Sequence, residues 1–148
     1  MNLWRISNHH SLDGEGGRRA PARWHSGEQP IVYLAASAAG ALLEILAHLE
    51  LKEASAPRTY TLLRITAPDR LSIPTLTVPE SETWKDDEIL TRKLGDTWLK
   101  SRRSALARVP SSILPDTHNY LLNPLHPDAI RITIAEVHNA VLDPRLIR

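Results

Sequence analysis

The chain has 148 residues, 42% hydrophobic and 24% charged, a balance typical of one folded globular domain rather than of a disordered or membrane-embedded chain. Eighteen basic and seventeen acidic residues leave a net charge of +1, which argues against broad electrostatic capture of nucleic acid. The absence of cysteine excludes disulfides, thiolate nucleophiles and cysteine-type zinc sites.

The first ten residues show neither the basic region nor the apolar region of a signal peptide. No apolar run approaches the roughly 18 residues that a membrane span requires. A cytoplasmic protein is therefore expected.

The first third of the chain predicts two short strands and one helix. Residues 2–7 (NLWRIS) alternate as a strand does, and 31–35 (IVYLA) form a second β-type run. The polar stretch between them, 8–30, is interpreted as a long loop. Ser37 is the expected N-cap of a helix over 38–52. One side of this helix carries an apolar stripe predicted to face the core: Ala38, Leu42, Ile45, Leu46 and Leu49.

The remaining chain predicts four strands and one more helix. The strands are expected over 59–66, 71–78, 105–109 and 129–137. The helix is expected over 84–103, where Gly95 could interrupt it, with four inward side chains: Ile89, Leu90, Leu94 and Trp98. This order of elements is not a regular βαβ alternation. It predicts a single α+β domain, residues 1–148, with a mixed or antiparallel sheet.

Two cofactor and metal signatures are missing. The glycine cluster EGGRR, 15–19, has neither Walker spacing nor a G-x-G-x-x-G pattern after a strand, so it is interpreted as a flexible loop. The seven histidines include no H-E-x-x-H or comparable spacing, and no metal is expected.

Ser37 lies in A-A-S-A-A, between a predicted strand and a predicted helix. That layout is also the one of a nucleophile elbow, although a true elbow favours glycine at the flanking positions. Capping of the helix is the preferred interpretation, and a nucleophilic serine is the alternative.

Four polar side chains in the first third are candidates for ligand binding. Glu44 lies on a helix side that carries mainly small residues, which leaves space for a ligand, although the same face could simply meet water. Tyr33 suits a packed phenol with a satisfied hydroxyl. Arg5, inside an apolar strand, needs an anionic partner or a route to solvent. Arg23 next to Trp24 could be a stacked surface pair.

A second polar segment covers 109–127, where four prolines restrict the backbone. Ser111, Asn119 and Asn123 add short hydrogen-bonding side chains. The segment is either a plain rigid loop or a frame that holds polar groups at a ligand.

Together these segments resemble the RES family, the toxins of bacterial toxin–antitoxin pairs named for their Arg, Glu and Ser. The resemblance covers nearly the whole chain and rests on the order of seven motifs: LWRI, ARWHSG followed by PIVYLA, ALLEIL, GDTWL, VPS, NYLLNPLHP and DPRL.

The resemblance assigns the family's functional positions to single residues. They fall on Arg5, Arg23, Tyr33, Glu44 and Ser111.

Two neighbours of Arg23 depart from the family pattern. Ala22 stands where the family has Gly, and His25 where it usually has Asn. These departures concern the shape of the turn and leave the guanidinium of Arg23 in place.

The resemblance implies a fold similar to ADP-ribosyltransferases and cleavage of the nicotinamide–ribose bond of NAD+. In this scheme NAD+ is a substrate, phosphate is a potential co-substrate, and no cofactor is expected. Glu44 would stabilise positive charge on the ribose or hold its hydroxyls, and Arg5 and Arg23 would clamp the pyrophosphate, with Arg23 closer to the ribose. Tyr33 would contact the nicotinamide ring.

Two further residues complete the expected substrate site. Ser111 would hydrogen-bond the substrate or orient phosphate or water, and Asn119 is counted among the NAD+-binding residues.

The expected partner is an Xre-like antitoxin in an oligomeric complex, with no direct contact to nucleic acid or membrane. A protein ADP-ribosyltransferase of the same fold is one alternative function. A non-catalytic partner-binding module is another, favoured by Ala22 and His25. An RNA-cleaving toxin is disfavoured by the near-zero net charge.

Overall fold

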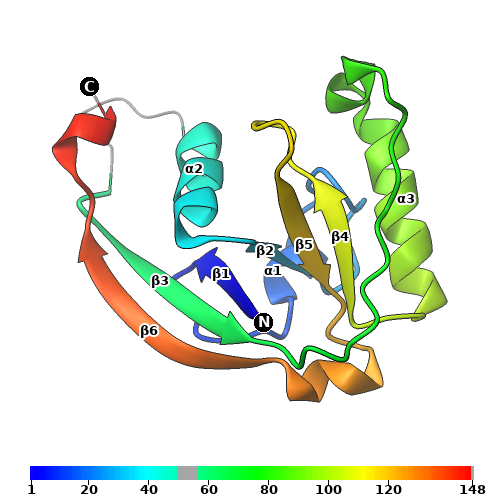
Figure 1. Cartoon of the computed structure of the whole chain (residues 1–148), viewed down its shortest axis with the longest axis horizontal. Helices are drawn as coiled ribbons and strands as arrows, with labels where there is room; N and C mark the ends of the chain where they lie inside the picture. The colour runs from blue at the N-terminus through cyan, green and yellow to red at the C-terminus, as the bar shows by residue number, and fades with distance from the viewer. Residues whose placement is uncertain (50–56, 148) are drawn as a thin grey trace.

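A computed structural model describes residues 1–49 and 57–147 (Figure 1). The described chain forms a six-stranded sheet in the order β4-β5-β2-β1-β3-β6, in which every neighbouring pair is antiparallel. The strands are β1 (Asn2–Ile6), β2 (Val32–Ala35), β3 (Thr59–Thr66), β4 (Leu106–Pro110), β5 (His118–Leu122) and β6 (Thr133–Val141). The α-helices are α1 (Glu15–Arg19), α2 (Ala38–His48) and α3 (Glu88–Ser101), and the 3-10 helices are η2 (Glu82–Asp86), η3 (Pro127–Arg131) and η4 (Pro144–Ile147).

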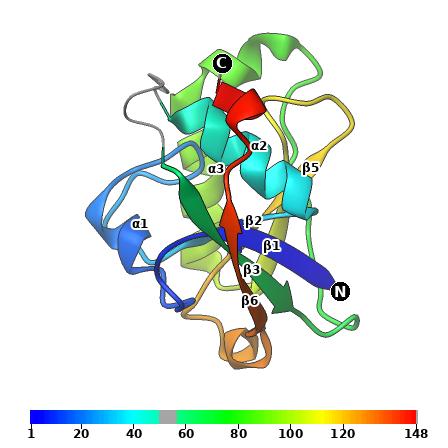
Figure 2. The same cartoon turned by 90° about the vertical axis from the view of Figure 1, so that its left-hand side faces the viewer.

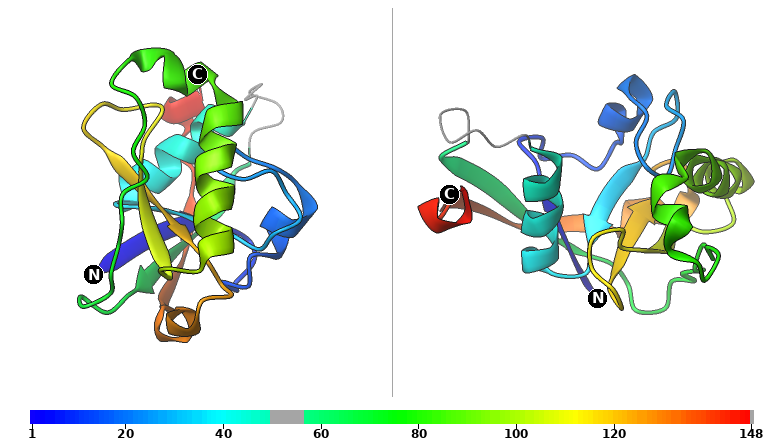
Figure 3. Two further views of the ribbon diagram at one scale, coloured as in Figure 1. Left: turned by 90° about the vertical axis from the view of Figure 1, so that its right-hand side faces the viewer. Right: turned by 90° about the horizontal axis from the view of Figure 1, so that it is seen from above.

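Each face of the sheet carries its own apolar cluster. Leu121 and Leu122 are neighbours in β5, so their side chains point to opposite faces. Leu121 packs with Trp98 and other residues beneath α3, which runs beside β4 (Figures 1 and 3). Leu122 packs with Leu3 and Leu63 on the other face, where β1 and β3 meet. Both clusters contain side chains that are almost fully buried.

The centre of the sheet is unevenly paired. Strands β1 and β3 pair over five residues, whereas β1 and β2 share the single pair Trp4–Ala35. Ala35 in turn lies opposite Asn119 of β5. Because paired residues share a sheet face, Trp4, Ala35 and Asn119 form one row. Helix α2 packs against β1 and β2 in the same part of the sheet (Figures 1 and 2). This row becomes the floor of the site described below.

The strands expected over 2–7, 31–35 and 59–66 are all present, as β1, β2 and β3. The N-cap prediction is confirmed as well: the Ser37 side chain accepts a hydrogen bond from the backbone N–H of Gly40 at 2.9 Å. Helix α2 ends at His48, and the part of the predicted helix at 50–52 lies outside the described residues.

The expected core-facing stripe of α2 is wrong. Ala41 is the buried residue of this helix, while Leu42 and Leu46 are half-buried and Leu49 is 38% exposed. A small alanine lets the helix approach the sheet closely, so the leucines lie on its flanks. Glu44 occupies the same side as Ala41, one turn further along.

The cluster EGGRR is not a flexible loop but the short helix α1. Gly17 in this helix is buried, and a Cβ at that position would come within 2.5 Å of the Ile31 side chain. The long loop predicted over 8–30 therefore contains a packed element. Pattern analysis missed it because one and a half helical turns give too little periodicity.

The strand predicted over 71–78 is wrong. This stretch touches the sheet through the isolated parallel bridge between Thr75 and Arg108. The N–H of Leu76 donates to the Arg108 carbonyl, but Pro74, two residues earlier, has no N–H for a continuing ladder.

The second predicted helix needs two corrections. Helix α3 runs from Glu88 to Ser101 without a break at Gly95, and the first residues of the predicted span form η2 instead. Ile89, expected inward, is 85% exposed, whereas Trp98 is buried as expected.

The end of the sheet also differs from prediction. The segment 109–127, interpreted as a rigid loop or as a frame for polar groups, contains β5, and the last strand begins at Thr133 rather than at 129. Residues 127–131 form η3, which starts at Pro127. The fold class itself is confirmed: an α+β domain with an antiparallel sheet. Within the described residues, no helix has the length and apolar character to cross a bilayer.

Candidate functional site

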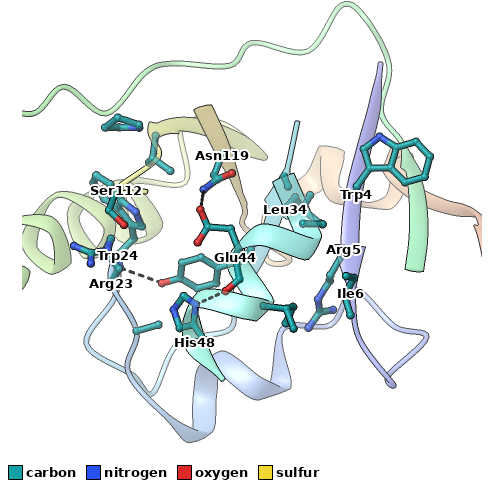
Figure 4. Close-up of a pocket in the computed structure, with 17 residues that line it drawn as sticks. Trp4, Arg5, Ile6, Arg23, Trp24, Leu34, Glu44, His48, Ser112 and Asn119 are labelled. Atoms are coloured by element: carbon teal, nitrogen blue, oxygen red, sulfur yellow. Dashed lines mark hydrogen bonds between the residues drawn. The ribbon is translucent and has the colours of Figure 1, made fainter. Parts of the chain in front are cut away.

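A cavity of about 400 Å³ opens between α2, the central strands and the turn that follows α1 (Figure 4). Its size lies in the range of small-molecule pockets. Apolar groups make most of the wall, and the polar or charged side chains in it come from distant parts of the chain: Arg5, Arg23, Tyr33, Glu44, His48, Ser112 and Asn119. Of the six residues predicted from the sequence, five line this one cavity.

Glu44 lies in the middle of the cavity wall, half-buried on α2. Its Oε1 accepts a 2.8 Å hydrogen bond from the Asn119 side-chain amide and a longer one, 3.4 Å, from the Ser111 hydroxyl. Among the described residues, no hydrogen bond occupies Oε2. The carboxylate is thus fixed by one oxygen and offers the other to a ligand.

Ser111 lies behind the carboxylate. Its side chain is buried, and its oxygen accepts hydrogen bonds from the backbone N–H groups of Ile113 (3.1 Å) and Leu114 (3.2 Å). With its lone pairs used in this way, the hydroxyl proton points to Glu44. The residue that lines the cavity is the next one, Ser112.

Arg23 lies on the opposite side of the cavity from β1. Its Nη1 donates to the carbonyl of Lys85 at 2.7 Å, and the turn around it is closed by a bond from the Ala22 N–H to the His25 carbonyl. The alternative of a stacked surface pair with Trp24 is wrong, because Trp24 is buried against Trp84.

Helix α3 holds this turn from outside. The Thr91 hydroxyl donates to the Arg23 carbonyl at 2.6 Å, and the Arg92 Nε–H donates to the Ala22 carbonyl at 2.9 Å. Both acceptors are carbonyl groups of the turn, outside any helix or strand, and each gains a hydrogen-bond donor from α3. The backbone on both sides of the Arg23 side chain is therefore anchored to a rigid helix.

Gly95 lets α3 and the turn approach each other. A Cβ at Gly95 would lie 1.6 Å from the Trp24 carbonyl oxygen, a distance that no side chain can occupy. Next to it, Asp96 accepts a 3.0 Å hydrogen bond from the Ser26 N–H. The G-D pair of the GDTWL motif thus serves to dock the Arg23 turn.

Replacing Thr91 by Val tests this docking. We expect the free energy of unfolding to fall by about 1–2 kcal/mol, because the partly buried Arg23 carbonyl loses its donor while the side-chain volume is kept. Chemical denaturation measures the change. Thr97→Val is the matched control, since Thr97 donates to a carbonyl of its own helix and is exposed. Equal losses in the two variants would show that the contact to Arg23 carries no special stability.

Arg5 reaches the cavity from β1. Strand alternation places it on the face opposite Trp4, but β1 pairs with β2 at one position only, so side chains of both faces line the wall here. Its Nη1 donates to the Ser11 carbonyl at 3.1 Å. Burial lowers the pKa of Arg5, and the nearby charge of Asp13 opposes that shift. Figure 4 places Arg5 and Arg23 on either side of Glu44.

Tyr33 presents its ring to the cavity from β2, and its hydroxyl is satisfied inside the protein, as expected for a packed phenol. The oxygen accepts from the Trp24 N–H at 3.1 Å and lies 2.7 Å from Nδ1 of His25. Burial raises the pKa of Tyr33 well above its usual value, so the phenol stays neutral at physiological pH.

Several residues that line the cavity were not predicted from the sequence. His48 follows Glu44 by one helical turn, a spacing that already indicated a shared face, and its Nδ1 donates to the Glu44 carbonyl. Trp4 and Ile6 alternate in β1 but gave no chemical signal. Ser112 lines the cavity, whereas the serine predicted for the site is its neighbour Ser111.

This arrangement defines a small α+β domain with an antiparallel sheet, in which a carboxylate and two guanidinium groups surround one cavity. A family model described as the RES domain matches residues 2–143. The chain therefore belongs to the RES family, as its motifs predicted.

Two relatives and one solved structure support this assignment. The chain is 44% identical to "Toxin Res" of Pseudomonas putida, with 99% of each chain covered. It is 35% identical to "Prs ADP-ribosylating toxin" of Sphingobium sp., covering 99% of this chain and 97% of the relative. The fold also matches the crystal structure of the M. tuberculosis MbcT-MbcA toxin-antitoxin complex, with a TM-score of 0.70 and 20% identity over 99% of this chain and 86% of the other.

Proposed function

We propose that this chain is the toxin of a toxin–antitoxin pair and that residues 1–148 form one unit that consumes NAD+ in the cytoplasm and thereby arrests growth. The observation that carries the proposal is the single cavity in which Glu44, fixed by Asn119, lies between Arg5 and Arg23. The names of the two relatives, both toxins, favour the same class.

The reaction breaks the bond between the nicotinamide nitrogen and C1 of the ribose. The electron pair of that bond returns to the ring nitrogen, so the positively charged pyridinium leaves as a neutral base and needs no general acid. Positive charge then develops on the ribose. The unoccupied Oε2 of Glu44 stabilises this charge or binds a ribose hydroxyl, while Asn119 keeps the carboxylate in place.

The two arginines suit the pyrophosphate, because a guanidinium binds phosphate oxygens with two parallel hydrogen bonds. Arg23 and Arg5 reach the cavity from opposite sides, so a pyrophosphate that lies between them can be bound by both. The ring of Tyr33 supplies a flat surface for the nicotinamide. Ser111 acts through Glu44, which it contacts, and Ser112 is the hydroxyl nearer to substrate or acceptor.

Release of nicotinamide is the direct test. Purified protein incubated with NAD+, with and without inorganic phosphate, is expected to release one nicotinamide for each NAD+ consumed. Mass spectrometry of the second product identifies the acceptor: ADP-ribose for water, and its phosphorylated form for phosphate. No nicotinamide under either condition would exclude hydrolysis and phosphorolysis and would leave transfer to a protein acceptor or a non-catalytic partner-binding module as the function.

A second candidate is transfer of ADP-ribose to a protein. The relative named "Prs ADP-ribosylating toxin", 35% identical over nearly the whole chain, favours it. The same cavity and the same bond cleavage serve this reaction, but a protein nucleophile then accepts the ribose. NAD+ labelled in its ADP-ribose part separates the candidates, since only transfer of ADP-ribose to a protein leaves the label on that protein.

We also propose a protein antitoxin of the Xre-like DNA-binding type as the partner, in an oligomeric complex. The solved structure with the same fold is a toxin–antitoxin complex. Co-expression with the cognate antitoxin is expected to restore growth, and the two proteins are expected to co-elute in size-exclusion chromatography.

A further inference from the structure

His25 is a buried imidazole that takes no part in the scheme above. It is 1% exposed and does not line the cavity. Both of its ring nitrogens have partners: Nδ1 lies 2.7 Å from the Tyr33 hydroxyl, and Nε2 lies 2.9 Å from the Gly17 carbonyl. A side chain held at both ends in this way has one orientation.

The partners determine where the protons lie. The Gly17 carbonyl can only accept, so Nε2 of His25 carries a proton. The Trp24 N–H can only donate, so the Tyr33 oxygen accepts from it and has its own proton to give. The remaining acceptor is Nδ1 of His25. All four groups are satisfied by a neutral imidazole protonated at Nε2, and burial keeps the phenol protonated.

The network joins three separate elements. His25 and Trp24 belong to the turn that carries Arg23, Tyr33 belongs to β2, and Gly17 belongs to α1. Glycine at position 17 allows α1 to pack directly on Ile31, the residue before β2, and this close packing brings the carbonyl within reach of the imidazole.

We propose that His25 is a positioning residue, which holds the Tyr33 hydroxyl and thereby fixes the Arg23 turn against the strand that forms the cavity floor. The Tyr33 hydroxyl makes its hydrogen bonds to Trp24 and His25, so only the ring of Tyr33 is available to a ligand. This inference builds on the proposed cleavage of NAD+ and adds a residue that acts on the site without touching substrate.

Two substitutions of His25 test its two hydrogen bonds one at a time. The amide of His25→Asn reaches the position of Nδ1 and can accept from Tyr33, but it falls short of Gly17. The amide of His25→Gln reaches the position of Nε2 and can donate to Gly17, but it leaves Tyr33 without an acceptor. Each variant loses one hydrogen bond of the network, so both are expected to lower the melting temperature.

The activities are expected to differ. His25→Gln should lower kcat for nicotinamide release by about tenfold, with the His25→Asn rate several-fold higher than that of His25→Gln. Tyr33→Phe should lower kcat as His25→Gln does, and the double variant should fall no further, because both remove the same contact. Additive losses in the double variant, or a lower rate for His25→Asn than for His25→Gln, would overturn the proposal.

A measurement without substrate keeps this test independent of the proposed reaction. Nitrogen NMR of the wild-type protein should show His25 protonated at Nε2, and Tyr33→Phe should shift the Nδ1 resonance. Protonation at Nδ1, or no shift in the variant, would contradict the network. If the wild-type protein released no nicotinamide, the proposed function would fail while the NMR result still decided the hydrogen bonds.

Discussion

Replacement of Glu44 by Gln is expected to lower nicotinamide release about a thousandfold and to leave the fold intact. The glutamine carbonyl can still accept from Asn119, so the local hydrogen bond is kept. What disappears is the negative charge that, in the proposed reaction, faces the ribose as positive charge develops on it. Initial rates of nicotinamide release, with circular dichroism and a melting curve on the same sample, measure both parts of the expectation.

Glu80→Gln is the matched control for this loss of charge. Glu80 is exposed in the segment before η2 and lies outside the cavity, so its replacement changes the net charge equally. Its rate is expected to equal that of the wild type. A folded Glu44→Gln protein that turns over NAD+ at the normal rate would remove Glu44 from the mechanism.

Gly95→Ala is expected to cost about 3 kcal/mol in the free energy of unfolding and to lower the melting temperature by about 10 °C. The added methyl would meet the Trp24 carbonyl at 1.6 Å, and neither backbone has a flexible end that can move aside. Relief of the clash requires the Arg23 turn to leave α3. Nicotinamide release should therefore fall along with stability.

Gly16→Ala is the matched control for the glycine substitution. Nothing lies within 4 Å of a Cβ at Gly16, which is exposed in α1. This variant should be as stable as the wild type or slightly more stable, because alanine loses less backbone entropy in a helix than glycine. A Gly95→Ala protein as stable as Gly16→Ala would show that the close approach of α3 to Trp24 is not needed.

Local patterns predicted the elements whose signals lie within a few residues. The alternation of β1 and the run that forms β3 belong to this group, as does the cap at Ser37. Stretches that depend on distant partners were not predictable in this way. Strand β5 lies among prolines and polar residues and becomes a strand because β2 and β4 flank it. The 71–78 stretch looks β-like, yet Pro74 lacks an N–H and interrupts a continuing ladder.

The side of α2 that faces the sheet was misjudged for a different reason. Hydrophobic periodicity selects the largest apolar side chains, here the leucines, as the buried face. Close approach to a sheet instead favours the smallest one, Ala41. The observation that small residues surround Glu44 on the helix was the better guide, because it indicated both the packed face and the space beside the carboxylate.

The candidate site was predictable in its residues but not in its internal contacts. The motifs identified five of the residues that line the cavity, among them Arg5, Glu44 and Asn119. They gave no sign that Ser111 contacts the carboxylate from behind or that His25 joins Tyr33 to α1. Such contacts join residues far apart in the chain, and a single sequence carries no record of them.

The docking of the Arg23 turn against α3 also depends on contacts between residues far apart in the chain. GDTWL was recognisable as a motif, but its role appears only when Gly95 and Asp96 are seen against Trp24 and Ser26. From the sequence alone, a glycine in the middle of a predicted helix indicates an interruption of that helix. In three dimensions it allows α3 to lie directly against the Trp24 backbone.

A crystal structure of the Glu44→Gln protein with bound NAD+ tests the central claim most directly, since this variant should bind the substrate without consuming it. The account predicts NAD+ in the cavity, with the nicotinamide ribose within hydrogen-bond distance of residue 44 and the pyrophosphate at Arg5 and Arg23. NAD+ bound elsewhere on the protein, or in the cavity with its ribose remote from residue 44, would contradict it.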